Sequence, residues 1–101
     1  MATTITGNAG GVLGDGQTWT TYTVGSTRVS GTLYTNSTGK PIQVMVGTNN
    51  TTNGTSATVN GVTVFSCGSA TQYIAVVLTV PNGQTYSVTA LTGLTTWAEL
   101  R

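Results

Sequence analysis

The chain contains 101 residues, of which only five are charged, and its formal net charge is +1. Charged residues make up 5% of the chain, where about 25% is usual, so an electrostatic surface for nucleic acid is excluded. One cysteine and no histidine exclude an internal disulfide and leave too few ligands for a metal site within one subunit.

Residues 1–16 are rich in glycine and show no hydrophobic period, which predicts a flexible lead-in or the end of a linker. Residues 17–101 are expected to form a single domain. Its first three strands are predicted over residues 17–24, 32–36 and 41–48. The third strand alternates cleanly and directs Ile42, Val44 and Val46 toward the core.

A hairpin is predicted around Asn60-Gly61, because both residues tolerate the positive φ of a type I′ turn. Its strands cover residues 56–59 and 62–65. On one face this turn would pair Val59 with Val62 and Ala57 with Val64.

The stretch over residues 72–91 is interpreted as two strands folded back on each other at Pro81-Asn82-Gly83. The outgoing strand is apolar on both faces, which predicts that it is central in its sheet or lies against a neighbouring subunit. A threonine-rich surface with little charge could be a hydroxyl-coated sandwich or a dry subunit interface. Depletion of charge is typical of interface cores and favours the interface.

A last strand is predicted over residues 94–101, although residues 95–100 could instead form one helical turn. About eight short strands separated by Gly, Asn and Pro turns predict an all-β fold, an antiparallel β-sandwich that is jelly-roll-like. If successive strands run antiparallel, three polar loops share the end of the sandwich that is remote from the lead-in. These loops are residues 25–31, 49–54 and 67–71, and a rigid scaffold would present them as a binding surface.

The chain has few residues that could act in catalysis. The only carboxylates are Asp15 and Glu99, and a glycosidase would need them about 5–9 Å apart across a cleft. Cys67 and the serines have no histidine to activate them. We therefore expect no enzyme activity and no cofactor. An ion bound on a symmetry axis of an oligomer is left as an alternative, because one ligand from each subunit would suffice. The six Trp and Tyr residues are expected in the core or an interface, with stacking on sugars as the alternative.

Five segments follow one another in a recognisable order: GDGQTW (14–19), YTNSTGKPI (34–42), VNGV (59–62), VPNGQTY (80–86) and WAELR (97–101). In this order and spacing they resemble the C-terminal tip domain of bacteriophage and prophage tail fibres. The resemblance implies a β-sandwich assembled as a homotrimer at the end of a fibre. It also implies a virion protein that is made in the host cytoplasm and touches the host surface. Because no fibre shaft precedes the tip, the chain is expected to be a fragment or a short stand-alone relative.

The function expected from this resemblance is adhesion to a bacterial cell-surface receptor, either a glycan or an outer-membrane protein, without membrane insertion. The polar loops would make the contact, and the candidate receptor-binding residues are Arg28, Asn49, Asn50, Asn53 and Ser69. One alternative is a structural trimerisation cap without a ligand of its own. A depolymerase is disfavoured because the chain lacks an evident acid and base.

Overall fold

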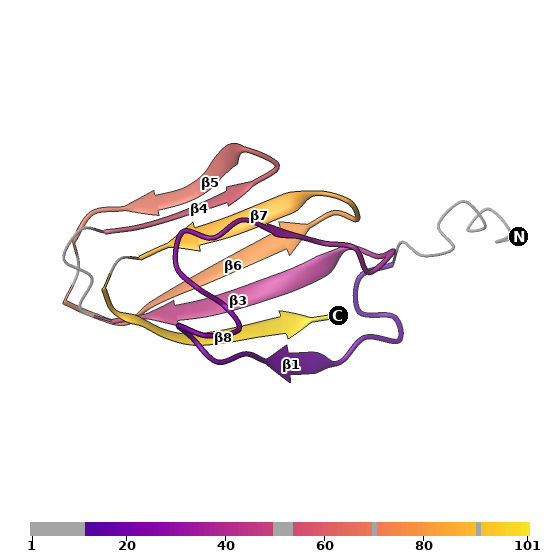
Figure 1. Ribbon diagram of the computed structural model, residues 1–101, viewed down its shortest axis with the longest axis horizontal. Helices are drawn as coiled ribbons and strands as arrows, with labels where there is room; N and C mark the ends of the chain where they lie inside the picture. The colour runs from indigo at the N-terminus through magenta and orange to yellow at the C-terminus, as the bar shows by residue number, and fades with distance from the viewer. Residues whose placement is uncertain (1–11, 50–53, 70, 91) are drawn as a thin grey trace, which may run out of the picture.

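The computed structural model describes residues 12–49, 54–69, 71–90 and 92–101. Its regular elements within these ranges are eight β-strands in two four-stranded antiparallel sheets that pack face to face (Figure 1). The predicted all-β, antiparallel sandwich is therefore confirmed. The strands are β1 (Trp19–Thr21), β2 (Tyr34–Thr35), β3 (Ile42–Thr48), β4 (Thr55–Val59), β5 (Val62–Cys67), β6 (Ile74–Val80), β7 (Thr85–Thr89) and β8 (Leu94–Leu100).

The two sheets have the strand orders β1-β8-β3-β6 and β2-β7-β4-β5. Consecutive strands change sheet at every connection except the one between β4 and β5. The turn at residues 81–83 thus joins β6 in one sheet to β7 in the other, and the predicted β6–β7 hairpin is wrong. The Gly83 N–H donates to the carbonyl of Asn36 at 2.7 Å, so the turn is tied to the β2–β3 connection and the chain crosses between the sheets.

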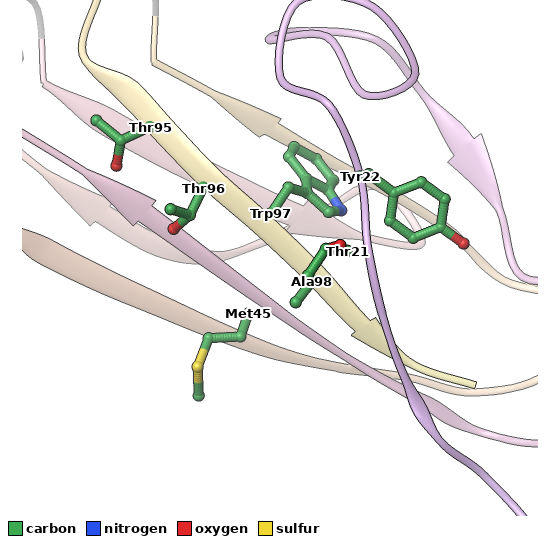
Figure 2. A pocket seen from close by; sticks show the side chains of 7 residues that line it. All are labelled: Thr21, Tyr22, Met45, Thr95, Thr96, Trp97 and Ala98. Carbon is green, nitrogen blue, oxygen red and sulfur yellow. The ribbon is translucent and has the colours of Figure 1, made fainter.

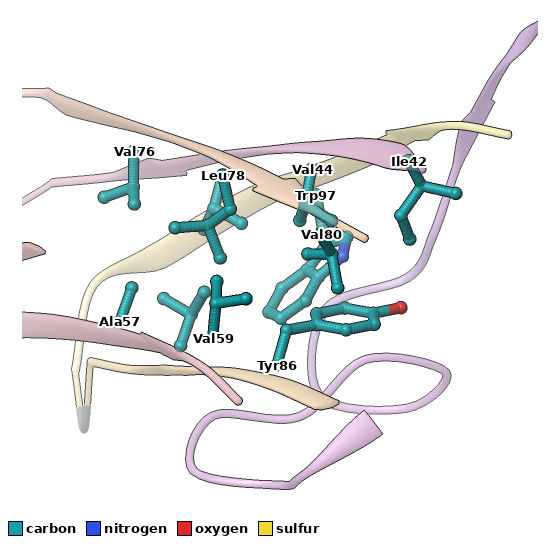
Figure 3. Close-up of a cluster of buried hydrophobic side chains, with 11 residues drawn as sticks. Ile42, Val44, Ala57, Val59, Val76, Leu78, Val80, Tyr86 and Trp97 are labelled. Carbon is teal, nitrogen blue, oxygen red and sulfur yellow. The ribbon is translucent and has the colours of Figure 1, made fainter. Parts of the chain in front are cut away.

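Aliphatic and aromatic side chains from both sheets fill the space between them (Figure 3). The inward residues predicted for β3 are confirmed, since Ile42, Val44 and Val46 are all fully buried. Full burial of an aliphatic or aromatic side chain contributes about 1.5–3 kcal/mol, so this layer is the main source of stability. The remaining buried hydrophobic residues of the cluster are Ala57, Val59, Val76, Leu78, Val80, Tyr86, Val88 and Trp97.

Strands β4 and β5 form the hairpin that the sequence predicts, and Val59 pairs with Val62 as expected. The register shifts just after Ala57, however, so that this residue faces Phe65. The predicted pair of Ala57 with Val64 is wrong because a bulge inserts an extra residue into β5. As a result Phe65 packs against the core, while Val64 is 53% exposed.

Strand β6 is the last strand of its sheet and, among the described strands, pairs only with β3. The predicted central position is therefore wrong. Its inward side chains are buried as expected from Val76 onward, but its outward side chains Ala75 and Val77 are exposed. The other interpretation of a two-sided apolar strand, contact with a neighbouring subunit, stays a prediction.

The first two strands are shorter than predicted, with three residues in β1 and two in β2. Strand β8 is extended throughout, so the alternative of a helical turn over residues 95–100 is wrong. Within β8 the two-residue period directs Trp97 and Glu99 inward, and both are buried.

The sandwich has two distinct ends (Figure 1). We call the first the turn end: it holds the turns at residues 36–40, 60–61 and 81–83. At this end the fully buried Asn36 donates its side-chain amide to the carbonyls of Lys40 and Val80 at 2.7 and 2.9 Å. The three tight turns thus share one end of the sandwich, as alternating strand directions require.

The opposite end, which we call the loop end, holds the connections β3–β4, β5–β6 and β7–β8 (Figure 1). The loop over residues 25–31 reaches it only in part. The Ala90 N–H donates to the Ser30 hydroxyl, and the Gly31 N–H donates to the Val88 carbonyl, so this portion lies beside the end of β7. Arg28 turns back toward Glu99 in the interior, so the predicted placement of this whole loop at the remote end is wrong there.

Candidate functional site

The loop end holds the described members of the predicted receptor-binding set other than Arg28. Asn49 directly follows β3, is half-buried, and donates its N–H to the Gly93 carbonyl at 2.8 Å. Ser69 is exposed in the connection between β5 and β6. Asn50 and Asn53 lie outside the described residues. The structure thus brings Asn49 and Ser69 to one end of the sandwich, as the strand order requires.

Backbone contacts hold the strands that frame this end. Gly54 adopts a φ of +81°, and a side chain there would collide with the Cys67 carbonyl. The start of β4 therefore approaches the end of β5 at a distance that only glycine permits. The Thr48 hydroxyl also donates to the Ile74 carbonyl at 3.3 Å, which ties β3 to β6. The described backbone around Asn49 and Ser69 is thus anchored on two sides.

Arg28, the remaining predicted contact residue, points into the protein. Its guanidinium donates to both carboxylate oxygens of Glu99, at 2.9 Å from Nε and 3.1 Å from Nη2. The guanidinium carbon also lies 3.8 and 4.6 Å from the ring centroids of Tyr22 and Tyr34, within cation–π range. Its third nitrogen donates to the Thr27 carbonyl. This geometry favours a structural role, and a receptor contact by Arg28 stays a prediction.

Glu99 is the centre of a buried polar cluster that we call the Glu99 cluster, formed with Arg28, Tyr86, Trp97 and Arg101. Glu99 is fully buried and accepts five hydrogen bonds from these four residues. The Tyr86 hydroxyl and the Trp97 indole N–H donate at 2.8 and 2.9 Å, and Arg101 donates at 3.0 Å. The cluster joins β7 of one sheet to β8 of the other and fastens the β1–β2 connection between them.

These contacts perturb the ionisation of the cluster. Burial alone would raise the pKa of Glu99, but the hydrogen bonds from Arg28, Trp97 and Tyr86 lower it below its ordinary value. Burial and the hydrogen bond to Glu99 raise the pKa of Tyr86 to about 12. For Arg28, burial would lower the pKa, but the hydrogen bond and charge of Glu99 raise it overall. All three groups thus keep their usual charge near neutral pH.

The chemistry of the cluster is that of a structural ion pair. A carboxylate held in its charged form by five donors is a poor general acid, and its burial keeps substrate away. The other carboxylate, Asp15, lies in an exposed turn whose backbone carbonyl accepts a hydrogen bond from Lys40 Nζ. Among the described residues, no three His, Cys, Asp or Glu side chains gather as a metal site.

Sequence reasoning placed Glu99 in the last strand but did not pair it with Arg28. One signal was available: the two-residue period puts Glu99 on the same face as Trp97, and a buried Trp97 implies a buried carboxylate that needs a cation. The identity of that cation required the fold, because Arg28 lies 71 residues earlier in the chain. Two of the six aromatic residues are also not in the core, since Trp19 is 50% and Tyr73 is 79% exposed.

The chain matches no family model, no curated protein and no solved structure. Among the described residues there is no helix that could cross a membrane.

Proposed function

We propose that this chain is a non-enzymatic, receptor-binding tip domain of a bacteriophage or prophage tail fibre, active as a homotrimer. In this proposal the protein is part of the virion, is made in the host cytoplasm, and adheres to a bacterial surface glycan or outer-membrane protein. The strand orders β1-β8-β3-β6 and β2-β7-β4-β5 support a jelly-roll-like sandwich for such a tip.

The observation that carries the proposal is the position of the five segments that resemble the tail-fibre family. They are far apart in the chain, yet they contact one another around the turn end. The Gln17 amide donates to the Pro41 carbonyl at 2.8 Å, and the Arg101 N–H donates to the Thr18 carbonyl at 3.0 Å. The Asn60 N–H donates to the Thr85 carbonyl at 2.8 Å. Segments that meet in this way act as one structural unit.

The segment YTNSTGKPI is the centre of this unit. Its Asn36 contacts the VPNGQTY segment through the Val80 carbonyl, and the Asn82 side chain accepts a hydrogen bond from the Gly39 N–H at 3.0 Å. Tyr34 packs edge-on against Trp97 of the WAELR segment, with ring centroids 6.0 Å apart. The resemblance therefore lies in residues that build the fold. A receptor would then be recognised by residues outside these segments, which the loop end supplies.

Loop exchange combined with adsorption to susceptible cells tests this division. Replacing residues 49–53 and 68–72 with sequences of equal length, while keeping Gly54, should abolish adsorption and leave the unfolding midpoint nearly unchanged. As a matched control, Thr63→Ser changes an exposed position of β5 and should adsorb like the parent protein. Unchanged adsorption by the loop variants would refute recognition through the loop end.

The second candidate function is a structural trimerisation cap that binds no receptor. It is favoured by the same observation, because the resembling segments build the turn end and none of them forms the loop end. In that case trimers should form normally, and the purified protein should adsorb to no susceptible cell. Avidity from three copies makes the adsorption test sensitive, since weak individual contacts add up.

A further inference from the structure

The outward faces of the two sheets differ in chemistry. The outward face of β1-β8-β3-β6, which we call the outer apolar face, has as its apolar members Trp19, Met45, Ala75, Val77, Ala98 and Leu100; its polar members are Gln43, Thr79, Thr21 and Thr96. Its middle row is fixed by the register, because Met45 pairs with Ala98 on one side and with Val77 on the other. Met45 and Val77 are 43% and 49% exposed, so the centre of this face is apolar and open to solvent.

The outward face of the other sheet is coated with hydroxyl groups instead. Thr58 and Ser87 are cross-strand neighbours there and share a hydrogen bond of 2.7 Å. Exposed hydroxyl groups interact well with water, so the centre of this face does not require a partner, although β5 at its edge exposes Val62 and Val64 by 61% and 53%. The contrast with the outer apolar face follows from the sequence pattern. In β7 and β4, apolar residues alternate with hydroxyl residues, whereas in β6 the residues on both faces are mostly apolar.

The outer apolar face is also hollowed. A depression of about 240 Å³ lies beside the end of β1, between residues of β1, β3 and β8 (Figure 2). Met45, Ala98 and Thr96 line it together with Thr21, Tyr22, Thr95 and Trp97. A depression of this kind would accept an apolar side chain from a facing surface.

Within the described residues, no strand pairs with the outer edge of β6. Edge strands are usually blunted by lysine, proline or a bulge, because their free backbone groups attract other strands. The seven residues of β6 contain no proline and no charge, and β6 pairs with β3 without a register shift. Beside its start, the Tyr73 ring is 79% exposed.

Charge decides which partner fits. All five charged residues lie elsewhere: Arg28, Glu99 and Arg101 belong to the Glu99 cluster, and Asp15 and Lys40 lie beside the turn end. A charged partner would lose hydration on this face without gaining a counter-charge. A second copy of the chain offers such an uncharged surface, and in a trimer each copy can turn this face toward the shared three-fold axis.

We propose that the outer apolar face is the surface on which a second copy of this chain docks, with Met45 and Val77 at its centre. The inference rests on the homotrimer of the proposed function and names the surface that would hold it together. Strands β8, β3 and β6 have seven residues each and β1 has three, so at about 4.8 Å between strands and about 3.3 Å per residue the projected area is on the order of 400 Å². A standard interface buries about 800 Å² per partner, so the contact extends over the edge of β6 and Tyr73.

The test compares two lysine pairs by native mass and sizing at several protein concentrations. Met45→Lys with Val77→Lys should convert the oligomer to a monomer. Thr58→Lys with Ser87→Lys adds the same charge to the hydroxyl face and should leave the oligomer intact. A monomeric parent protein, or an oligomer that survives the Met45 and Val77 changes, would overturn the inference.

A milder pair covers the case in which the lysine variant does not fold. Met45→Gln with Val77→Thr preserves shape and should weaken association at least tenfold while circular dichroism and unfolding of the monomer stay the same. Unchanged association would again contradict the inference. Adsorption is measured separately: an oligomer that depends on Met45 and Val77 but adsorbs to no cell refutes receptor binding and leaves the docking surface standing.

Discussion

At the scale of residues, the most informative group is a carboxylate in a protein that has almost no charge. Glu99 is fully buried, and burial of an unpaired carboxylate would be strongly unfavourable. Two arginines and two aromatic donors satisfy it instead. A buried ion pair need not stabilise a protein relative to an apolar replacement, but loss of one partner is costly because the other charge stays buried. The cluster therefore specifies how the β1–β2 connection docks more than it adds stability.

Replacing Arg28 tests this directly. Arg28→Met should lower the free energy of unfolding by about 3–5 kcal/mol, because Glu99 would lose its bidentate partner while remaining buried. Arg28→Met with Glu99→Gln should be less destabilised than the single variant by at least about 1 kcal/mol, since no buried carboxylate is then left unpaired and Arg101, which also loses its partner, is 24% exposed. Lys40→Met is the control, with an expected loss below about 1 kcal/mol, because its hydrogen bond is exposed. Urea denaturation measures all three, and a single variant as stable as the control would contradict the assignment.

The same cluster predicts how stability depends on pH. The pKa of Glu99 is lowered in the folded state, so its contribution is present above its ordinary value of 4.5 and is lost as the pH falls through the folded value. The pKa of Tyr86 is raised from 10.0 to about 12, so its contribution is present below pH 10 and is lost between these two values. The unfolding free energy should be nearly flat in between.

Urea unfolding across the pH range measures this profile, with one variant for each limb. Tyr86→Phe should remove most of the alkaline fall, and Glu99→Gln should flatten the acid fall. An alkaline limb that is unaltered in Tyr86→Phe would show that another group causes it.

At the scale of elements, the sequence predicted where strands lie better than which strands pair. The two-residue period located β3 and β6 almost to the residue, because their inward side chains are apolar except for Thr48 at the end of β3. The turn at residues 81–83 was also recognised, but a turn signal does not say whether the next strand joins the same sheet. That choice depends on Asn36, whose carbonyl accepts the Gly83 N–H from a distant part of the chain. The two-residue period and the turn residues are local features of the sequence, whereas strand pairing is set by contacts between residues that are far apart in the chain.

The bulge in β5 and the position of β6 were missed for the same reason. A single extra residue in β5 moves Phe65 onto the core, and the alternating pattern of residues 56–59 and 62–65 did not predict it. Strand β6 carries apolar side chains on both faces, which predicted that both faces are buried. Within one subunit, the outward side chains Ala75 and Val77 are exposed. Of the candidate site, Asn49 and Ser69 were placed at one end correctly because alternating strand direction alone decides it. The inward turn of Arg28 was not predictable, since it depends on Glu99.

Asn36 offers a prediction at this scale. Its amide donates two hydrogen bonds to carbonyls, and its side-chain oxygen accepts from the Thr38 N–H and hydroxyl at 3.1 and 2.7 Å. Asn36→Asp replaces the two donors with an acceptor facing carbonyl oxygens, and should lower the free energy of unfolding by about 2–4 kcal/mol. Asn82→Asp is the control: its oxygen only accepts from the Gly39 N–H and is exposed, so a change within about 0.5 kcal/mol is expected.

Thermal or urea unfolding of the two aspartate variants decides the point. If both lose stability equally, the effect comes from added negative charge near the turn end and not from the donors of Asn36.

At the scale of the whole molecule, the five charged side chains lie away from the outward faces of both sheets. Three of the five charged residues pair in the Glu99 cluster, where two arginines share one carboxylate, and the other two lie beside the turn end. What the protein shows to its surroundings is therefore a hydroxyl face, an apolar face and polar connections. Such a surface associates through shape and burial of apolar area, with little electrostatic steering.

This arrangement predicts how assembly responds to salt. Raising sodium chloride from about 50 to about 500 mM shortens the screening length severalfold, yet the association constant should change by less than about threefold because no exposed charge pair is at stake. Ammonium sulfate at the same ionic strength should strengthen association, because it is excluded from apolar surface and favours burial. Analytical ultracentrifugation in the two salts measures both effects. A drop of more than about tenfold in sodium chloride would mean that Lys40 or Asp15 contributes to the contact, and that subunits meet at the turn end and not across Met45 and Val77.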